Sequence, residues 1–271
     1  MFAYMKQKPG FYRQVAALAA PIVLQNLITS TLSMADTFMV GILGEAPMAA
    51  VTLANIPLFV VQLFIFGVQS GSSVLISQYW GKQDMESINR VMGVALWVVL
   101  LVSSVFAAIL LLRPVEFLSL FGNQPEVVAM AAQYGSIAGI SYVLNAFTMM
   151  YVAAYRSMER PKLGMYILAA SMTVNTCLNW VFIFGNLGAP ALGVRGAALA
   201  TLIARGIEVT IVATHMLKNT FFRIRGKLLL RPGFDMVKRF LRYGGLVVCN
   251  ETMWGLGTSI FPTIMGHMAG S

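Results

Sequence analysis

Long apolar stretches separated by short polar or charged segments run through the whole chain. We identify seven, each long enough for the helix of about 20 residues that crosses roughly 30 Å of hydrocarbon. They cover residues 14–41, 47–79, 88–112, 127–153, 163–184, 196–217 and 240–266. They lack the strict alternation of membrane strands, and helices satisfy their own backbone hydrogen bonds in lipid. The pattern therefore predicts an all-α integral membrane protein, a polytopic helix bundle.

Composition and charge agree with this pattern. Hydrophobic residues make up 58% of the 271 residues and charged residues 11%, against about 45–50% and about 25% in a soluble domain. If the N-terminus is cytoplasmic, all of the 19 lysines and arginines lie in inner segments except Arg113, Arg195 and Arg205, as the positive-inside rule requires. The net charge of +9 then reflects topology and contact with an anionic lipid leaflet, and nucleic acid is not needed as a partner.

One acid stands out in the first apolar stretch. Asp36 lies in "TLSMADTFMVGILG", where a central carboxylate costs about 2.5–3.5 kcal/mol on insertion. With the topology above, it lies roughly 8 Å below the outer end of its helix. Asn175 and Asn179 share one face of the fifth span at a similar depth, because they are four residues apart, and Thr201 of the sixth span reaches the same level. We therefore expect these four side chains to meet in the outer half of the bundle.

Two interpretations of this polar group remain open. Asn and Thr in membrane interiors often only hold helices together. The alternative is a site for a cation or proton, since hard cations take carboxylate, amide, hydroxyl and carbonyl oxygens, and the acid favours this second interpretation. The same choice applies to Glu251 near the middle of the last span. Arg205 and Glu208 are three residues apart and are predicted to pair as a structural contact.

Two further features concern the helices themselves. Pro21 lies inside the first span, where it removes one backbone hydrogen bond and is a candidate hinge. Cys177 and Cys249 both fall within spans, so we expect buried free thiols and no disulfide.

Four longer motifs carry a family resemblance. They are "AAPIVLQNLITSTLSMADTFMVGILG", "ISQYWGKQD", "AYRSMERPKL" and "NTCLNWVFIFGNLGAPALGVRGAALAT". In their order and loop lengths they resemble the N-terminal lobe of the multidrug and toxic compound extrusion (MATE) family. The resemblance implies two six-helix lobes that work by alternating access. It also implies export of amphipathic, often cationic organic compounds in exchange for Na⁺ or H⁺, with no enzyme activity and no cofactor besides the coupling ion.

The resemblance also implies a coupling site. Its members would be Asp36, Asn175, Asn179, Thr201 and the carbonyl group of Ala197, with Glu251 as an acid of the C-terminal lobe. Many prokaryotic members carry an acid where this chain has Asn179. This departure leaves one carboxylate instead of two, so the choice between sodium and proton stays open.

The resemblance divides the chain into three parts. Residues 1–217 form the six-helix N-terminal lobe, residues 218–239 a cytoplasmic interlobe linker, and residues 240–271 the first helix of a C-terminal lobe. We expect a truncated piece of a longer transporter, which needs the missing lobe as its partner. The alternative is a natural half-size protein that assembles with another chain.

Other functions fit the sequence less well. A seven-helix receptor or retinal protein is disfavoured by the inner N-terminus and by the lack of a lysine inside the seventh span. An intramembrane enzyme would need a His-rich motif, paired aspartates or a Walker A sequence, which we do not find. The nearer rival is a lipid-linked oligosaccharide flippase of the same superfamily, for which Arg205 alone offers a cavity cation. We expect the cytoplasmic membrane of a bacterium as the location.

Overall fold

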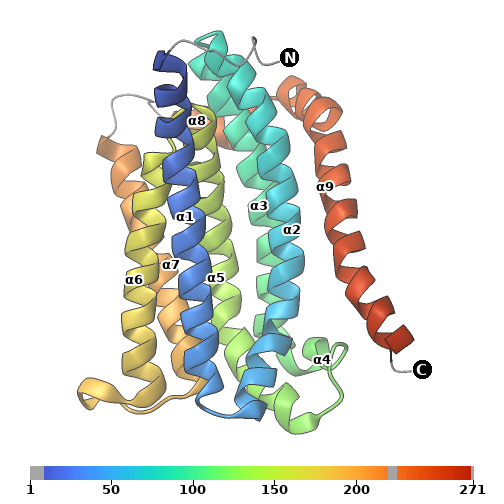
Figure 1. The fold of residues 1–271 in the computed structure, drawn as a ribbon. Coiled ribbons are helices and arrows are strands. Elements are labelled where there is room, and N and C mark those ends of the chain that lie inside the picture. Colours follow the sequence, from blue (N-terminus) through green and yellow to red (C-terminus); the bar gives the residue numbers. More distant parts are fainter. Residues whose placement is uncertain (1–8, 219–224, 270–271) are drawn as a thin grey trace.

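The computed structural model describes residues 9–218 and 225–269 as a bundle of long helices (Figure 1). In chain order the elements are α1 (Pro9–Gly41), α2 (Glu45–Gly81), α3 (Met85–Leu112), α4 (Pro114–Leu118), α5 (Pro125–Ser157), α6 (Lys162–Phe184), the 3₁₀ turn η2 (Asn186–Gly188), α7 (Val194–Lys218), α8 (Gly226–Leu230) and α9 (Phe234–Ala269). No strand occurs in the described residues. The predicted all-α bundle is therefore confirmed.

Local signals explain where the helices begin and end. The side chain of Asp84 accepts a hydrogen bond of 3.0 Å from the N–H of Ser87 and so caps α3. Pro114 and Pro125 occupy the first turns of α4 and α5, where a missing N–H costs nothing. Gly185 ends α6 with a left-handed φ of 75°, a conformation that glycine adopts without strain.

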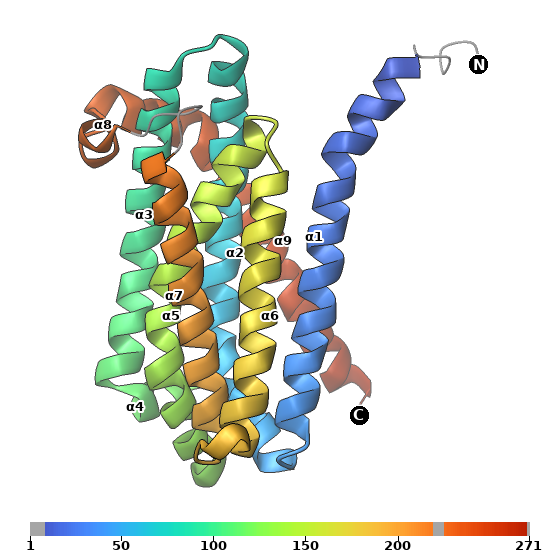
Figure 2. The same ribbon diagram turned by 90° about the vertical axis from the view of Figure 1, so that its left-hand side faces the viewer.

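The core of the bundle lies around α5. This helix packs against α2, α3 and α7, and it carries large fully buried side chains such as Tyr142, Tyr151 and Met150. In contrast, α1 stands at the edge and packs mainly on α6. Figure 2 shows its N-terminal half leaning away from the other helices. The first helix is therefore the one that the rest of the lobe holds least firmly.

Helix α9 packs mainly along α2. Glycines permit this close contact, because a Cβ added to Gly71 would lie 2.8 Å from the carbonyl oxygen of Gly244. Gly67 faces the backbone of Val248 in the same way. The contact places α9 directly against α2.

Six described helices are long and apolar enough to cross a membrane: α1, α2, α3, α5, α6 and α7. They match the first six predicted spans. The seventh predicted span falls within α9, which is a helix of 36 residues but is not one of these six, so its role as a span stays a prediction. The division into lobe, linker and further helix also stays a prediction, and residues 1–8, 219–224 and 270–271 lie outside the described residues.

The prediction for the cysteines was wrong in one respect. Cys177 and Cys249 are free thiols, as expected, but both are exposed and not buried. In a membrane helix an outward face meets lipid, which is as apolar as the protein interior, so apolar character does not distinguish the two faces.

Candidate functional site

Asp36 of α1 meets the paired asparagines of α6 in the C-terminal halves of both helices. The side-chain nitrogen of Asn179 donates to a carboxylate oxygen of Asp36 at 2.6 Å and lies 3.3 Å from the amide oxygen of Asn175. Asn179 and Asn175 are 2% and 8% exposed. The first contact joins α1 to α6 through a hydrogen bond to a carboxylate, which is about twice as strong as a neutral one.

Thr201 of α7 completes the group. The side-chain nitrogen of Asn175 lies 3.4 Å from the hydroxyl oxygen of Thr201. With the Asn175 amide turned over, its nitrogen lies 3.0 Å from both carboxylate oxygens of Asp36, and its oxygen accepts from the N–H of Thr201 at 3.3 Å. Either orientation links three helices. The structure therefore brings together the four side chains that depth and spacing placed at one level.

A cavity of about 300 Å³ opens beside this group. Asp36, Asn179, Ala197 and Thr201 line it, and Ala197 lies on the same face of α7 as Thr201 because the two are four residues apart. The cavity is large enough for an ion with several waters. Asn175, the remaining member of the predicted site, is buried and does not line the cavity.

The cavity contains residues that the sequence did not reveal. Tyr134 of α5 and Asn55 of α2 line it, together with Thr52. Nothing in the local sequence distinguishes Tyr134 from the other buried tyrosines of α5. Arg205 also lines the cavity, and here a signal was present, because it lies four residues after Thr201 and so shares its face of α7.

Arg205 is already paired. Its guanidinium nitrogen Nη1 lies 2.6 Å from a carboxylate oxygen of Glu208, whose side chain is fully buried. The predicted pairing is therefore confirmed. The second carboxylate oxygen of Glu208 has no hydrogen-bond partner among the described residues. The pair neutralises both charges at the cavity wall, and Asp36 is left as the unneutralised acid there.

The donor set fits a small monovalent cation or a proton. The described residues contain no group of three or more His, Cys, Asp and Glu side chains that could hold a metal ion, so a strongly charged divalent site has no support here. A single carboxylate, two amides and a hydroxyl supply oxygen ligands with one negative charge. The amide oxygen of Asn179 is buried and has no hydrogen-bond partner in the described part of the chain, which makes it available to an incoming cation.

The two remaining predicted residues lie elsewhere. Pro21 is a buried residue inside the continuous helix α1, and it is 15 residues, about 22 Å, from Asp36. Glu251 is partly buried on α9 and does not line the cavity around Asp36. The roles of both residues, and the coupling role of the Asp36 group, stay predictions.

Comparison with known proteins supports the resemblance found in the motifs. The family model MatE matches residues 21–181. A protein of Rhizobium meliloti named "Probable multidrug resistance protein NorM" is 32% identical over 72% of this chain and 41% of its own length. "Probable multidrug resistance protein YoeA" of Bacillus subtilis is 30% identical over 88% of this chain and 50% of its own length.

Solved structures agree in fold. An outward-facing multidrug resistance MATE transporter of the MOP superfamily matches with a TM-score of 0.79 at 21% identity, over 91% of this chain and 53% of that one. An inward-facing one matches with a TM-score of 0.71 at 20% identity, over 90% and 55%. The chain thus spans about half the length of the relatives that it matches, corresponding to about the N-terminal lobe. On the strength of the family match, the chain belongs to the MatE family of multi-span membrane transporters.

Proposed function

We propose that this chain forms the N-terminal lobe of a secondary antiporter in the cytoplasmic membrane of a bacterium, with its N-terminus inside. The transporter exports amphipathic or cationic organic compounds in exchange for Na⁺ or H⁺ by alternating access. The relatives named multidrug resistance proteins support the substrate class. The observation that carries the coupling role is the contact of 2.6 Å between Asn179 and Asp36 inside a cavity.

This contact changes when Asp36 binds an ion. Ionised and empty, the carboxylate accepts the N–H of Asn179. A sodium ion at the carboxylate repels that N–H, and the amide must turn its free oxygen toward the ion. A proton instead makes the carboxyl a donor, which also favours the amide oxygen. Occupancy therefore alters the bond between α1 and α6, and α1 is the helix least firmly held by its neighbours.

The flippase remains the second candidate, and the cavity favours it less. A site for a lipid-linked pyrophosphate needs several free cations. Among the described residues that line the cavity, Arg205 is the one basic residue, and it forms an ion pair with Glu208. An efflux assay and a lipid-flipping assay on the same proteoliposomes separate the two functions.

The decisive experiment is Asp36→Asn in the protein that contains both lobes. The amide has the same shape but cannot exchange a cation or proton, so we expect efflux of a cationic dye, driven by an imposed Na⁺ or H⁺ gradient, to fall to background. Glu45→Gln is the matched control, because it removes an exposed acid at the same end of the bundle. Gradient-driven efflux at the normal rate by Asp36→Asn would remove Asp36 from the mechanism.

A further inference from the structure

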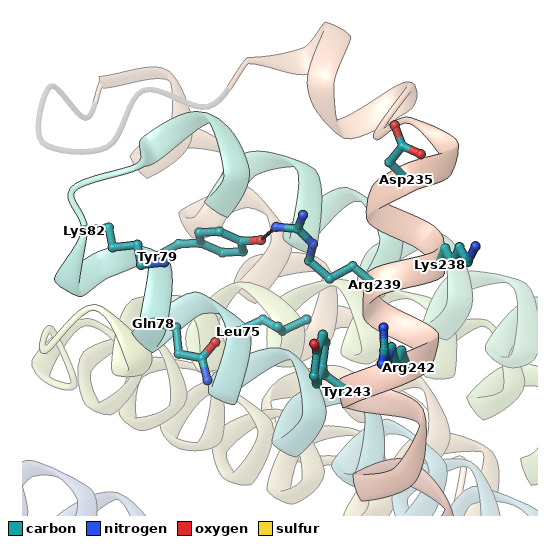
Figure 3. A pocket seen from close by; sticks show the side chains of 9 residues that line it. All are labelled: Leu75, Gln78, Tyr79, Lys82, Asp235, Lys238, Arg239, Arg242 and Tyr243. Atoms are coloured by element: carbon teal, nitrogen blue, oxygen red, sulfur yellow. Dashed lines mark hydrogen bonds between the residues drawn. The ribbon is translucent and has the colours of Figure 1, made fainter.

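A second cavity lies at the opposite end of the bundle, between the C-terminal end of α2 and the beginning of α9. It measures about 600 Å³. We call it the basic pocket, and it is lined by Leu75, Gln78, Tyr79, Lys82, Asp235, Lys238, Arg239, Arg242 and Tyr243 (Figure 3). Four of these residues are cations and one is an acid. The pocket therefore offers a strongly positive surface that no part of the proposed transport cycle uses.

The cations are arranged by the helix and not scattered over the surface. Lys238 and Arg242 are four residues apart on α9, as are Arg239 and Tyr243, so the four share one face of this helix. The guanidinium of Arg239 donates to the hydroxyl oxygen of Tyr79 at 2.6 Å, across the gap between α9 and α2 (Figure 3). Arg242 also lies 5.7 Å from the centre of the Tyr243 ring. The bond to Tyr79 thus holds Arg239 toward α2.

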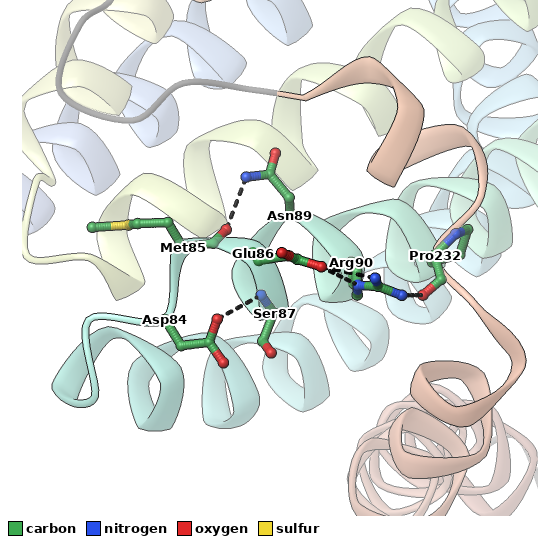
Figure 4. A network of polar contacts seen from close by, with 7 residues as sticks. All are labelled: Asp84, Met85, Glu86, Ser87, Asn89, Arg90 and Pro232. Atoms are coloured by element: carbon green, nitrogen blue, oxygen red, sulfur yellow. Dashed lines mark hydrogen bonds and ion pairs between the residues drawn. The ribbon is translucent and has the colours of Figure 1, made fainter.

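The charges of the pocket are not neutralised within the described residues. The ion pairs found there are Arg90–Glu86, Arg113–Glu116 and Arg205–Glu208. Arg90 of α3 shows the contrast at the same end of the bundle: it contacts the Glu86 carboxylate at 2.8 Å and donates to the carbonyl oxygen of Pro232 at 3.2 Å (Figure 4). Arg90 thus has an acidic partner within the protein. The cations of the basic pocket have no such partner among the described residues, so the pocket can accept an external anion.

The depth of the pocket favours a lipid over a free anion. Lys82 is an exposed lining residue, and Leu75 lies seven residues before it, roughly 10 Å further along the helix. Leu75 is 2% exposed. Just beyond Tyr243 on α9, Leu246 is 74% exposed and offers an apolar surface. A ligand that follows this path meets cations first and apolar side chains next, which is the order of groups in a phospholipid.

We propose that the basic pocket binds the phosphate-bearing headgroup of an anionic phospholipid from the leaflet that meets this end of the bundle. The headgroup phosphate contacts Lys238 and Arg242 of α9 and Lys82, which directly follows α2, and an acyl chain runs past Tyr243 along α9. Basic pockets between membrane helices bind such headgroups by the same chemistry. The lipid joins α2 to α9, and this inference does not depend on what the protein transports.

The test compares two pairs of substitutions that remove equal charge. Lys238→Gln with Arg242→Gln empties the pocket of two cations, whereas Lys227→Gln with Arg231→Gln removes two exposed cations of the neighbouring α8 segment. Purified protein in a neutral detergent is titrated with phosphatidylglycerol, and bound lipid is counted by native mass spectrometry. We expect the pocket pair to bind about tenfold more weakly, and the control pair to change by less than about twofold.

Two further ligands test what the pocket recognises, and one further variant controls for a folding defect. Phosphatidylcholine tests the headgroup charge, and inorganic phosphate tests whether the acyl chains matter. Tyr79→Phe keeps every charge but frees Arg239, and we expect an affinity loss of about threefold in a protein that folds normally. Equal losses in both charge pairs, equal binding of phosphatidylcholine, or inorganic phosphate that binds as tightly as the lipid would each overturn the proposal.

Discussion

The cavity around Asp36 and the basic pocket are both formed by long apolar helices, but they carry charges of opposite sign. In the cavity around Asp36 one carboxylate is surrounded by amides and a hydroxyl, and the nearby Arg205 is paired with Glu208. In the basic pocket four cations face one acid without an ion pair among the described residues. The first site fits a small cation and the second an anion.

The difference follows from the solvent. Asn179 and Glu208 are buried, so every charge near them needs a partner within the protein or a bound ligand. Lys238 and Arg242 are exposed at the end of the bundle, where water and lipid headgroups satisfy them at little cost. We therefore expect charge changes around the cavity of Asp36 to alter stability and transport strongly. Charge changes at exposed positions at the opposite end of the bundle should alter stability little.

Breaking the buried pair is expected to have the largest effect on stability. Arg205→Met leaves the fully buried carboxylate of Glu208 without its cation, which lowers the free energy of unfolding by about 3–5 kcal/mol. The double variant Arg205→Met with Glu208→Met restores most of the loss, because no charge stays buried. Unfolding by a denaturing detergent measures both. If the single and double variants were equally unstable, the pair would act through packing and not through charge.

Adding a second acid to the cavity around Asp36 tests whether Asp36 and Asn179 bind one ion together. Asn179→Asp places two carboxylates within contact distance, and like charges at short range need a cation between them. We expect transport to become dependent on sodium, with half-activation at about tenfold lower Na⁺. Asn186→Asp adds the same charge outside the cavity and serves as the control. Unchanged ion dependence in Asn179→Asp would show that Asn179 and Asp36 do not share an ion.

Much of this architecture could be predicted because a membrane restricts the arrangement of helices. Spans must run nearly parallel, so the distance of a residue from the end of its helix gives its depth, and spacing by four gives its face. These two facts were enough to bring Asp36, Asn175, Asn179 and Thr201 together. Arg205 and Glu208 followed from the same rule of spacing.

The remainder depends on how the helices are rotated and paired. Depth does not say which face of α5 points inward, so Tyr134 was not foreseen at the cavity. Hydrophobic character does not separate lipid from protein interior, so the exposed Cys177 was expected to be buried. The basic pocket requires the pairing of α2 with α9, and the positive-inside rule alone counted its cations as markers of topology.

A smaller effect is expected from Pro21 in α1, the helix that carries Asp36. Pro21 lies in the N-terminal half of α1 and Asp36 near its C-terminal end, and a missing backbone bond lets the helix bend at little cost. Pro21→Ala restores that bond, so we expect turnover to fall by about threefold while substrate affinity changes by less than about twofold. Both are measured in the protein with two lobes. Undiminished turnover would mean that the proline serves packing alone.

The smallest expected effect comes from Asp84, the acid that precedes α3. Asp84 resembles Asp36 in accepting an N–H, but it caps α3 outside the membrane-spanning segments (Figure 4). Hydrogen bonds from the side chain and then the backbone of Ser87 hold the pKa of Asp84 below its ordinary value of 3.8. A lowered folded pKa means that the stabilisation is complete above the ordinary value. It is lost as the pH falls through the folded value.

Two substitutions of Asp84 separate the cap from its charge. Asp84→Ala removes the acceptor and lowers the free energy of unfolding at neutral pH by about 1 kcal/mol. Asp84→Asn keeps an acceptor that does not titrate, so we expect it to remain close to the wild type at neutral pH. As the pH falls below about 4, the stability difference between the wild type and Asp84→Ala should shrink. The stability difference between Asp84→Asn and Asp84→Ala should stay the same. Unfolding midpoints at pH 7 and pH 3 measure this difference, and a wild-type advantage that was as large at pH 3 as at pH 7 would show that the carboxylate charge is not what stabilises the cap.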